Sequence, residues 1–389
     1  GRCADVDGIV AEMFIYAGED LLQCLLDIFN TMIINNSFDS AWYRSAFTML
    51  PKTGDSSKPS NWRPIAVLKI TYKIFAMLLL NRLAPFLEHE QPADQLGFRR
   101  GLGIDDAMVV LENVCGKCLA WESDIWFASL DLQKAFDRIE HDSLFQALQA
   151  QGVPDTYLQV LRRLYTGQSG IVRGSNCVFD ITRGVKQGDV LSPMLFNSGL
   201  EHAMRNWKQS LKSHGLHVGA VDRLTNIRYA DDLLLFAKSW KELVEMLELL
   251  VVELNRVGLQ LNTSKTKLFT TSYLQHPLYI DGCGDLLAVL WGEEKHKYLG
   301  RTISGHLKRR GLVELQHRIQ IGWMTFHKYK CILTNKHIAL KLRLQLFDAV
   351  VSPTILFGLA TLPLTKSDLS HRGQTTTENA SIDCWLDTT

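Results

Sequence analysis

Two adjacent carboxylates between two apolar runs constrain how the middle of this chain folds. Asn226–Ala230 has the composition of a short strand, and Leu233–Ala237 is a continuous apolar run of strand length. The bend between them holds Asp231 and Asp232, with no Gly or Asn to supply the backbone conformation that tight turns favour. Because adjacent like charges repel, the arrangement calls for a counter-charge, most simply a divalent metal ion. The alternative is a solvated acidic turn.

A third carboxylate ends another apolar strand. Ile125–Leu130 is apolar, and Asp131 follows it directly. A carboxylate at the end of a buried strand is held rigidly at a sheet edge, where a site can form. The alternatives for Asp131 are a helix N-cap or a surface acid. Asp105 and Asp106, in contrast, fall where a loop enters a helix, and we interpret them as solvated.

Three carboxylates on separate strand ends suit two Mg²⁺ ions roughly 4 Å apart. Such a pair clamps the attacking and leaving oxygens of an in-line phosphoryl displacement. Hard cations prefer oxygen ligands and retain several waters, so a few carboxylates and the substrate phosphates suffice. Helices between the strands would complete an α+β domain with the acids on one sheet.

The charge of the chain is concentrated in one segment. The chain carries 42 Lys and Arg against 41 Asp and Glu, but residues 295–343 hold twelve of the basic residues and a single acid, Glu314. The rest is therefore acidic. An acidic body with one basic stripe is typical of a protein that presents that stripe to a polyanion, and we favour nucleic acid over a solvated helix face.

The cysteines and apolar runs argue against a disulfide-rich, a zinc-binding or a membrane-spanning protein. The eight cysteines are scattered, which favours a reducing compartment over a disulfide framework. Cys115 and Cys118 have zinc-type spacing, but no second Cys or His pair lies near them, so we expect one helix face. No uninterrupted apolar run approaches the ~18 residues that span a membrane, so no membrane partner is expected.

Local signals also predict helix boundaries. The apolar pattern of Asp20–Ile34 predicts a helix. Another is expected over about Thr71–Glu88, broken or kinked near Pro85. Ser192 followed by Pro193 predicts a helix with Ser192 as its N-cap.

Seven short segments occur in an order that resembles the reverse transcriptases of non-LTR (LINE-type) retrotransposons and, more distantly, of group II introns. Any one segment would be a weak match, whereas seven in register across roughly residues 8–360 are highly specific. The segments are Asn61-Trp-Arg-Pro-Ile65, Gln95–Gly101, Leu130–Asp137, Val185–Phe196, Tyr229–Asp232, Leu261–Lys267 and Lys297–Gly300.

The resemblance implies an α+β, right-hand polymerase fold with fingers, a palm built on an antiparallel sheet, and a helical thumb. Asp5-Val-Asp-Gly8 stands where the family has a Gly-Pro-Asp-Gly turn, so we expect truncated N-terminal fingers. The expected parts are fingers at 1–120, a palm at 121–300 with a fingers-like insertion at 150–185, a thumb at 301–365 and a disordered tail at 366–389.

The implied activity is RNA-directed DNA polymerisation, in which a DNA or RNA primer is extended with dNTPs on an RNA template. Asp131, Asp231 and Asp232 would be catalytic residues that bind two Mg²⁺, with Mn²⁺ as a substitute. A catalytically decayed, nucleic-acid-binding remnant of a retroelement and an RNA-templated RNA polymerase stay open as alternatives. The family also implies an endonuclease encoded elsewhere in a longer polyprotein, and a nuclear site of action for which no targeting signal is visible.

Further roles carry over by position. Phe136 matches the steric gate that would strike a ribose 2′-OH, although a core aromatic is the alternative. Lys265 or Lys267 is expected to protonate the leaving pyrophosphate, and the choice stays open. The other expected substrate contacts are Arg63, Lys73, Arg99, Leu132, Gln187, Gly188 and Tyr229. Contacts to the nucleic acid, through a primer grip and a thumb that tracks duplex phosphates, are expected from Tyr298, Leu299, Gly300, Lys308, Arg309 and Arg310.

Overall fold

The computed structural model describes residues 4–5, 7–52, 55–218, 223–274, 279–282, 285–292, 294–304 and 307–364. The prediction for the tail at 366–389 lies outside these residues. The chain forms two compact units that alternate along the sequence. Unit 1 comprises Gly1–Arg99, Asp131–Ser213 and Glu245–Asn262, and unit 2 comprises Arg100–Leu130, His214–Val244 and Thr263–Thr389.

Unit 1 is built on a four-stranded sheet in the order β2-β1-β4-β5. β1 pairs antiparallel with β2 and parallel with β4, and β4 pairs antiparallel with β5. β2 and β5 are therefore the edge strands. Their bounds are β1 (Arg44–Pro51), β2 (Trp62–Val67), β4 (Gln168–Val172) and β5 (Val178–Ile181).

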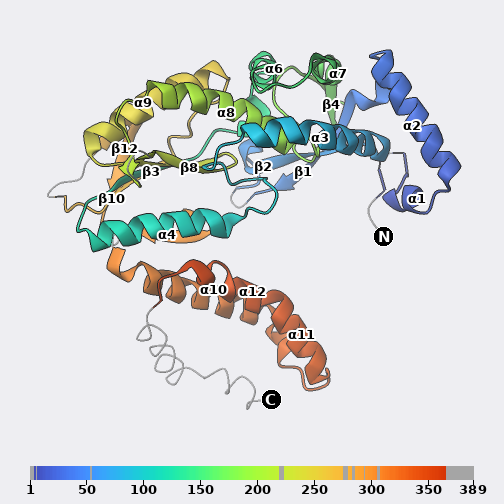
Figure 1. Ribbon diagram of the computed structural model, residues 1–389. Coiled ribbons are helices and arrows are strands. Elements are labelled where there is room, and N and C mark those ends of the chain that lie inside the picture. The colour runs from blue at the N-terminus through green and yellow to red at the C-terminus, as the bar shows by residue number, and fades with distance from the viewer. Residues whose placement is uncertain are drawn as a thin grey trace. The chain divides into compact units, whose positions relative to one another are not determined.

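Helices supply most of the core of unit 1. α8 buries residues on several sides, and Trp207 at its C-terminal end is fully enclosed and donates to the carbonyl of Met246 at 2.9 Å. α6 and α7 lie side by side (Figure 1). The helices are α1 (Ala11–Ile15), α2 (Glu19–Ile34), α3 (Ile70–Glu90), α5 (Ala135–Arg138), α6 (His141–Ala150), α7 (Asp155–Tyr165), α8 (Ser192–Ser210) and most of α9 (Trp240–Arg256), with 3₁₀ turns η1 (Ser40–Trp42) and η2 (Pro59–Asn61).

The structure confirms the predicted helix at α2 and corrects two boundaries. α3 continues through Pro85, so the helix is not broken there, while the alternative of a kink stays a prediction. Proline removes one hydrogen bond, but the buried side chains Leu83 and Leu87 continue the packed face on both sides of it. α8 has Leu191 as its N-cap, and Ser192 is its first helical residue rather than the cap.

Unit 2 is built on a six-stranded sheet in the order β11-β12-β10-β3-β9-β8. All pairs are antiparallel except β10 with β12, which is parallel. β3 is buried along its whole length, and Phe127 on it stacks on Phe269 of β10 at 4.9 Å. The bounds are β3 (Trp126–Leu130), β8 (Asn226–Tyr229), β9 (Asp232–Ala237), β10 (Lys267–Thr270), β11 (Tyr279–Gly282) and β12 (Asp285–Leu290).

The rest of unit 2 consists of two small hairpins and a helical group. α10, α11 and α12 pack on one another (Figure 1). Cys115 and Cys118 lie on α4 and are both buried, and burial raises the pKa of the Cys115 thiol to about 12. The elements are α4 (Ile104–Ala120), β6 (Leu216–His217), β7 (Arg223–Leu224), β13 (Lys295–Tyr298), β14 (Arg301–Ser304), η3 (Leu307–Arg309), α10 (Arg310–Leu333), α11 (Leu340–Val350), α12 (Ser352–Leu356) and η4 (Leu359–Thr361).

Two helical segments, Ile70–Glu90 and Leu340–Thr361, are long and apolar enough to cross a membrane by length and composition. The first is α3, whose apolar side chains include six that are buried in unit 1. A core helix of this kind passes the same test, so the segments are weak evidence for a membrane. The absence of a membrane partner stays a prediction.

Candidate active site

The predicted Asp-Asp hairpin forms a two-residue turn in unit 2. Tyr229 pairs with Asp232 across β8 and β9, which confirms the two strands expected from the sequence. Ala230 supplies the backbone conformation that the missing Gly would have given, with φ of 58°. Positive φ at the first central residue alone is the pattern of a type II′ turn. A non-glycine residue in this region costs roughly 1–2 kcal/mol, and its neighbour Asp231 is thereby held at the turn.

The register of the sheet in unit 2 shows how β3, the strand that precedes the third carboxylate, pairs. Leu130, the last residue of β3, pairs with Leu233 of β9. Asp232 precedes Leu233, and Asp131 follows Leu130 directly along the chain. Strand β3 therefore ends beside the start of β9. The sequence predicted that Asp131 and Asp232 lie at the ends of separate strands. The strand that precedes Asp131 (β3) and the strand that opens with Asp232 (β9) are neighbours in the sheet.

Asn262 orients the Asp131 carboxylate. Its side-chain Nδ2 donates to Asp131 Oδ2 at 2.8 Å, and its backbone N–H donates to the Asp131 carbonyl at 2.8 Å. Leu132, next to Asp131, is buried and forms an isolated bridge with Leu261. The sequence offered Leu261–Lys267 as a motif, but nothing in it identified Asn262 as the partner of an acid 131 residues upstream.

The donor set fits a hard divalent cation, because all three predicted ligands are carboxylates and one of them is already oriented by an amide. In the part of the chain that the structure describes, however, no three His, Cys, Asp or Glu side chains are grouped so that they could hold a metal ion. The chemistry of the ligands therefore supports metal binding, while the arrangement of a bound ion stays a prediction.

The predicted primer-grip residues form a second two-residue turn, between β13 and β14. Tyr298 pairs with Arg301, and Leu299 and Gly300 both have positive φ, 47° and 81°. This is the pattern of a type I′ turn. Tyr298 is buried, and burial, with the charge of Asp232 as a further cause, raises the pKa of its hydroxyl. Within unit 2, Tyr298 thus lies close enough to the acidic hairpin to sense its charge.

A buried arginine braces this second turn. Arg318 on α10 donates through Nη2 to the Gly300 carbonyl and through Nε to Glu314 at 2.6 Å. The other carboxylate oxygen of Glu314 accepts from the backbone N–H of Thr302 at 2.8 Å. The Arg318 guanidinium also lies 4.6 Å above the ring of Phe357. Arg318 belongs to the basic segment, but its position in the sequence does not distinguish it from solvated neighbours.

The basic segment separates into four arginines that are buried or nearly so and eight exposed cations. Arg310 is bound by Glu112 of α4 at 2.6 Å, which also binds Arg301 at 2.6 Å, so the predicted phosphate contact at Arg310 serves a structural ion pair. The four enclosed cations are Arg301, Arg310, Arg318 and Arg343. The planar guanidinium suits such internal pairs. The eight exposed cations are Lys295, Lys297, Lys308, Arg309, Lys328, Lys330, Lys336 and Lys341.

The two candidates for the general acid lie near the same strand. Lys267 opens β10 and pairs with Ser129 of β3, two residues before Asp131. Burial, with the charge of Lys267 as a second cause, lowers the pKa of His296, whose ring contacts the Ser129 hydroxyl at 3.2 Å. Lys265 is exposed in the preceding turn. The general-acid role, and the choice between Lys265 and Lys267, stays a prediction.

Phe136, the predicted gate, is stacked against other aromatic side chains in unit 1. Its ring stacks on Phe196 of α8 at 4.6 Å and meets the edge of Phe98 at 6.2 Å. Phe136 is half-buried on α5, while Phe196 behind it is fully buried. The arrangement fixes one ring face and leaves part of the side chain accessible. The sequence motifs contain both partners, but give no sign that the three rings meet.

The predicted Gln187–Gly188 contact is anchored to β2. The Gln187 carbonyl accepts from the Ala66 N–H at 2.7 Å, and its side chain donates to Asp137 at 3.4 Å. Gly188 has φ of 108°, and a Cβ there would lie 2.8 Å from the Ala66 carbonyl oxygen. Position 188 therefore requires glycine, because any side chain there would clash with the Ala66 carbonyl.

A buried charged cluster supports this loop from behind. The Tyr72 hydroxyl donates to Asp189 at 2.6 Å, and Lys186 Nζ lies 5.9 Å from the centre of the Tyr72 ring. Lys186 Nζ has no hydrogen-bond partner in the described structure. Burial lowers the pKa of Lys186 to about 8, an effect that the charge of Asp189 opposes. Burial also raises the pKa of Asp189.

The remaining residues that were predicted to contact substrate differ in how exposed their side chains are. Arg63 is exposed on β2, and Lys73 is half-buried on α3. Arg99 donates to Glu88 at 3.1 Å and to the carbonyls of Pro92 and Gln95 at 2.8 and 3.1 Å. The guanidinium of Arg99 therefore organises its own loop. Tyr229 is half-buried at the end of β8.

The comparisons with known proteins identify the family. The family model for reverse transcriptase (RNA-dependent DNA polymerase) matches residues 50–303, more than half of the chain. The chain belongs to the reverse transcriptase family. This confirms the predicted α+β polymerase fold class and the resemblance to enzymes of non-LTR retrotransposons. The family generally uses divalent metal ions.

Curated relatives come from mobile elements. The chain is 32% identical over 220 residues to the retrovirus-related Pol polyprotein from type-2 retrotransposable element R2DM of Drosophila melanogaster, covering 56% of this chain and 20% of the relative. It is 24% identical over 357 residues to the RNA-directed DNA polymerase from mobile element jockey of Drosophila melanogaster, covering 88% and 37%. The chain thus spans well under half the length of these relatives.

Among solved structures, a telomerase from Candida albicans in complex with a TWJ fragment of telomeric RNA aligns with a TM-score of 0.49 and 13% identity. The alignment covers 93% of this chain and 62% of that chain.

Proposed function

We propose that this chain is an RNA-directed DNA polymerase that extends a DNA or RNA primer with dNTPs on an RNA template. The observation that carries the proposal is the register of unit 2, in which Leu130 pairs with Leu233, so that β3 ends beside the start of β9, the strand that opens with Asp232. Family membership supports the reaction class.

In this proposal Asp131, Asp231 and Asp232 hold two Mg²⁺ ions, for which Mn²⁺ can substitute. When bound, the metals activate the primer 3′-OH and neutralise charge on the phosphates. Asn262 keeps the Asp131 carboxylate in one orientation through its 2.8 Å hydrogen bond. Lys265 or Lys267 donates a proton to the leaving pyrophosphate.

The substrate side is proposed to lie in unit 1. Phe136, backed by Phe196, excludes a ribose 2′-OH and so selects dNTPs. Gln187 and Gly188 contact the incoming nucleotide or template, and the close approach to β2 that the glycine permits holds this loop in place. Arg63 and Lys73 are the available fingers cations, whereas Arg99 acts through the loop that it organises.

For the nucleic acid, we propose that Tyr298, Leu299 and Gly300 grip the primer and that exposed cations of the thumb follow duplex phosphates. Lys308 and Arg309 are exposed and suit this role, while Arg310 supports it by fixing α10 to Glu112. The domain limits proposed are fingers at 1–120, palm at 121–300 and thumb at 301–365, with an endonuclease in a longer polyprotein.

A primer-extension assay on an RNA template tests the proposal. The chain should incorporate dNTPs in the presence of Mg²⁺, and Asp231→Ala should lower the rate roughly a thousandfold or more. Asp105→Asn, an exposed acid at the start of α4, is the matched control and should leave the rate unchanged. Product that is indifferent to Mg²⁺ or to Asp231→Ala would refute the mechanism.

Two other outcomes identify the alternatives. Duplex binding by the wild-type chain without incorporation, with either Mg²⁺ or Mn²⁺, would make it a decayed nucleic-acid-binding remnant. Equal incorporation of rNTPs and dNTPs by the wild type, unchanged in Phe136→Ala, would indicate an RNA-templated RNA polymerase.

A further inference from the structure

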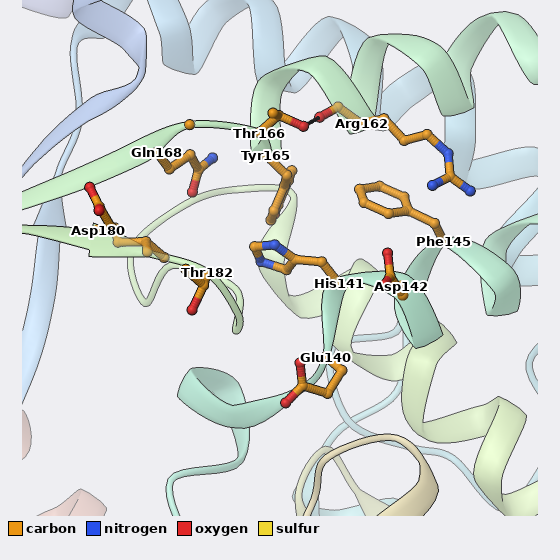
Figure 2. A pocket seen from close by; sticks show the side chains of 12 residues that line it. Glu140, His141, Asp142, Phe145, Arg162, Tyr165, Thr166, Gln168, Asp180 and Thr182 are labelled. Atoms are coloured by element: carbon orange, nitrogen blue, oxygen red, sulfur yellow. Dashed lines mark hydrogen bonds between the residues drawn. The ribbon is translucent and has the colours of Figure 1, made fainter.

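Unit 1 contains a cavity of about 590 Å³ that the proposed polymerase function does not use. It is bounded by α6, α7 and the β4–β5 pair, and its wall includes His141, Tyr165, Gln168 and Asp180 (Figure 2). None of the residues proposed above to contact nucleotide, metal or nucleic acid lines it.

A buried amide oxygen faces this cavity without a partner. The Gln168 side chain is 3% exposed, and its Nε2 donates to the Leu164 carbonyl at 2.6 Å. Because a carbonyl oxygen can only accept, the atom that bonds to Leu164 must be the amide nitrogen. The amide oxygen, Oε1, therefore faces away from Leu164. Oε1 has no hydrogen-bond partner among the described residues, and Figure 2 shows it turned toward the space between His141 and Asp180. The cavity therefore presents an unused acceptor.

The charged residues around the cavity are mainly acidic. Glu140, Asp142 and Asp180 line it, against one cation, Arg162. Arg162 lies 4.6 Å above the Phe145 ring, where it forms part of the wall. Among the described residues, none forms an ion pair with Asp142 or Asp180 (the Glu140 carboxylate lies 3.7 Å from Arg183). An acidic rim repels phosphates, so it disfavours nucleic acid and favours a cationic ligand.

Aromatic rings make the inner walls flat. The His141 ring meets the Tyr165 ring at 5.2 Å and 88°, and Phe145 meets Tyr165 at 6.2 Å. His141 is fixed by its Nε2, which donates to the Gly184 carbonyl at 2.8 Å. A planar cation with several N–H donors stacks on such rings and reaches surrounding acceptors, which is the chemistry of a guanidinium group.

The neighbouring strand β5 indicates that the guanidinium is carried by a polypeptide. β5 is an edge strand of the four-stranded sheet, and it contributes Asp180 and Ile181 to the cavity wall. Val178 and Phe179 on the same strand are 48% and 41% exposed. An exposed edge strand with apolar side chains can pair with an added extended segment.

We propose that this cavity and β5 together bind an arginine side chain on an extended segment of a partner protein. The segment adds a strand beside β5, and its arginine enters the cavity next to the His141 and Tyr165 rings. Its guanidinium donates to Gln168 Oε1 and pairs with Asp180, which lies on the same side of the cavity as Gln168 (Figure 2). This proposal is independent of the polymerase activity, because it uses none of the same residues.

The test uses the full chain and a fluorescent, capped heptapeptide of alternating Thr and Val with a central arginine. Fluorescence anisotropy should show binding at least about fivefold tighter than that of the same peptide with citrulline, which keeps the shape without the charge. Asp180→Asn should weaken binding roughly fivefold, since the charge pair is lost. Glu248→Gln, an exposed acid on α9, should leave it unchanged.

Hydrogen exchange supplies the second readout, because strand addition should slow exchange of β5 amides when the arginine peptide binds. Equal affinity for the citrulline peptide, or equal weakening by the control variant, would overturn the proposal. So would spermidine displacing the peptide without protecting β5, since the ligand would then be a free polyamine. An RNA oligonucleotide that competes for the cavity would overturn it as well.

Discussion

Two turns that carry predicted contacts are each supported by a buried ion cluster, but the clusters differ. In unit 2 the turn at Tyr298–Arg301 is held by Arg318 and Glu314, whose charged groups are hydrogen-bonded to each other and to the backbone. In unit 1 the loop at Val185–Asp189 is held by Tyr72 and Asp189, with Lys186 as the cation.

The difference lies in the cation. The guanidinium of Arg318 has a fixed fork of donors that binds Glu314 and the Gly300 carbonyl at once, so it is held in one position. The ammonium of Lys186 is buried without a hydrogen-bond partner among the described residues, and the pKa is lowered to about 8. The first cluster is therefore a permanent brace, and the second one can change charge within an accessible pH range.

The largest expected effect comes from removing the permanent brace. Arg318→Met leaves Glu314, which is 0% exposed, without its cation, and such breaks cost about 3–5 kcal/mol of unfolding free energy. Chemical denaturation measures it. Lys328→Met on the same helix, at an exposed position, should stay within about 0.5 kcal/mol. A similar cost for both variants would show that Arg318 is no more structural than a surface lysine.

The pH dependence of stability distinguishes the second cluster. The folded chain releases the Lys186 proton near pH 8, whereas the unfolded chain holds it to the ordinary value of 10.5. Between these values the unfolded state binds more protons, so stability rises with pH. Wild type should gain of order 3 kcal/mol over this window relative to Lys186→Met. Denaturation of both at several pH values measures this, and parallel curves would contradict it.

A glycine pair tests how tightly the unit 1 loop is held. Gly188→Ala should cost about 2 kcal/mol, because the new methyl group would meet the Ala66 carbonyl and the backbone has positive φ. Gly174→Ala is the control, since Gly174 also has positive φ but no atom within 4 Å of an added Cβ. The difference between the two thermal-denaturation costs isolates the contact with β2. Equal costs would mean that backbone strain alone explains the glycine.

The smallest expected effect is a gain. Leu299→Asn places at the first central position a residue that tolerates positive φ, ahead of Gly300, and should stabilise unit 2 by about 0.5 kcal/mol. Leu299→Ala, which loses the side chain but keeps the strained backbone, serves as the reference. If Leu299→Asn raises stability while primer binding weakens, the leucine side chain contacts nucleic acid; a loss of stability would mean that the turn is not strained.

Much of the candidate site was predictable because its signals are local. Apolar runs of strand length predicted β3, β8 and β9, and the acids that follow or interrupt them are read directly from the sequence. The predicted break at Pro85 does not occur, because packing of α3 outweighs the loss of one hydrogen bond. It was also incomplete for the basic segment, because position along the chain does not tell a buried arginine from an exposed lysine.

The sequence by itself determined the family, the strand ends that carry Asp131, Asp231 and Asp232, and the glycine at position 188. Only the tertiary structure assigned Asn262 to Asp131, Arg310 to Glu112 and Arg318 to Glu314 and the Gly300 turn. Apolar periodicity depends on neighbours a few residues apart, whereas these polar partners meet only when the chain has folded. Whether a basic residue is available at the surface therefore depends on whether folding gives it a buried acidic partner.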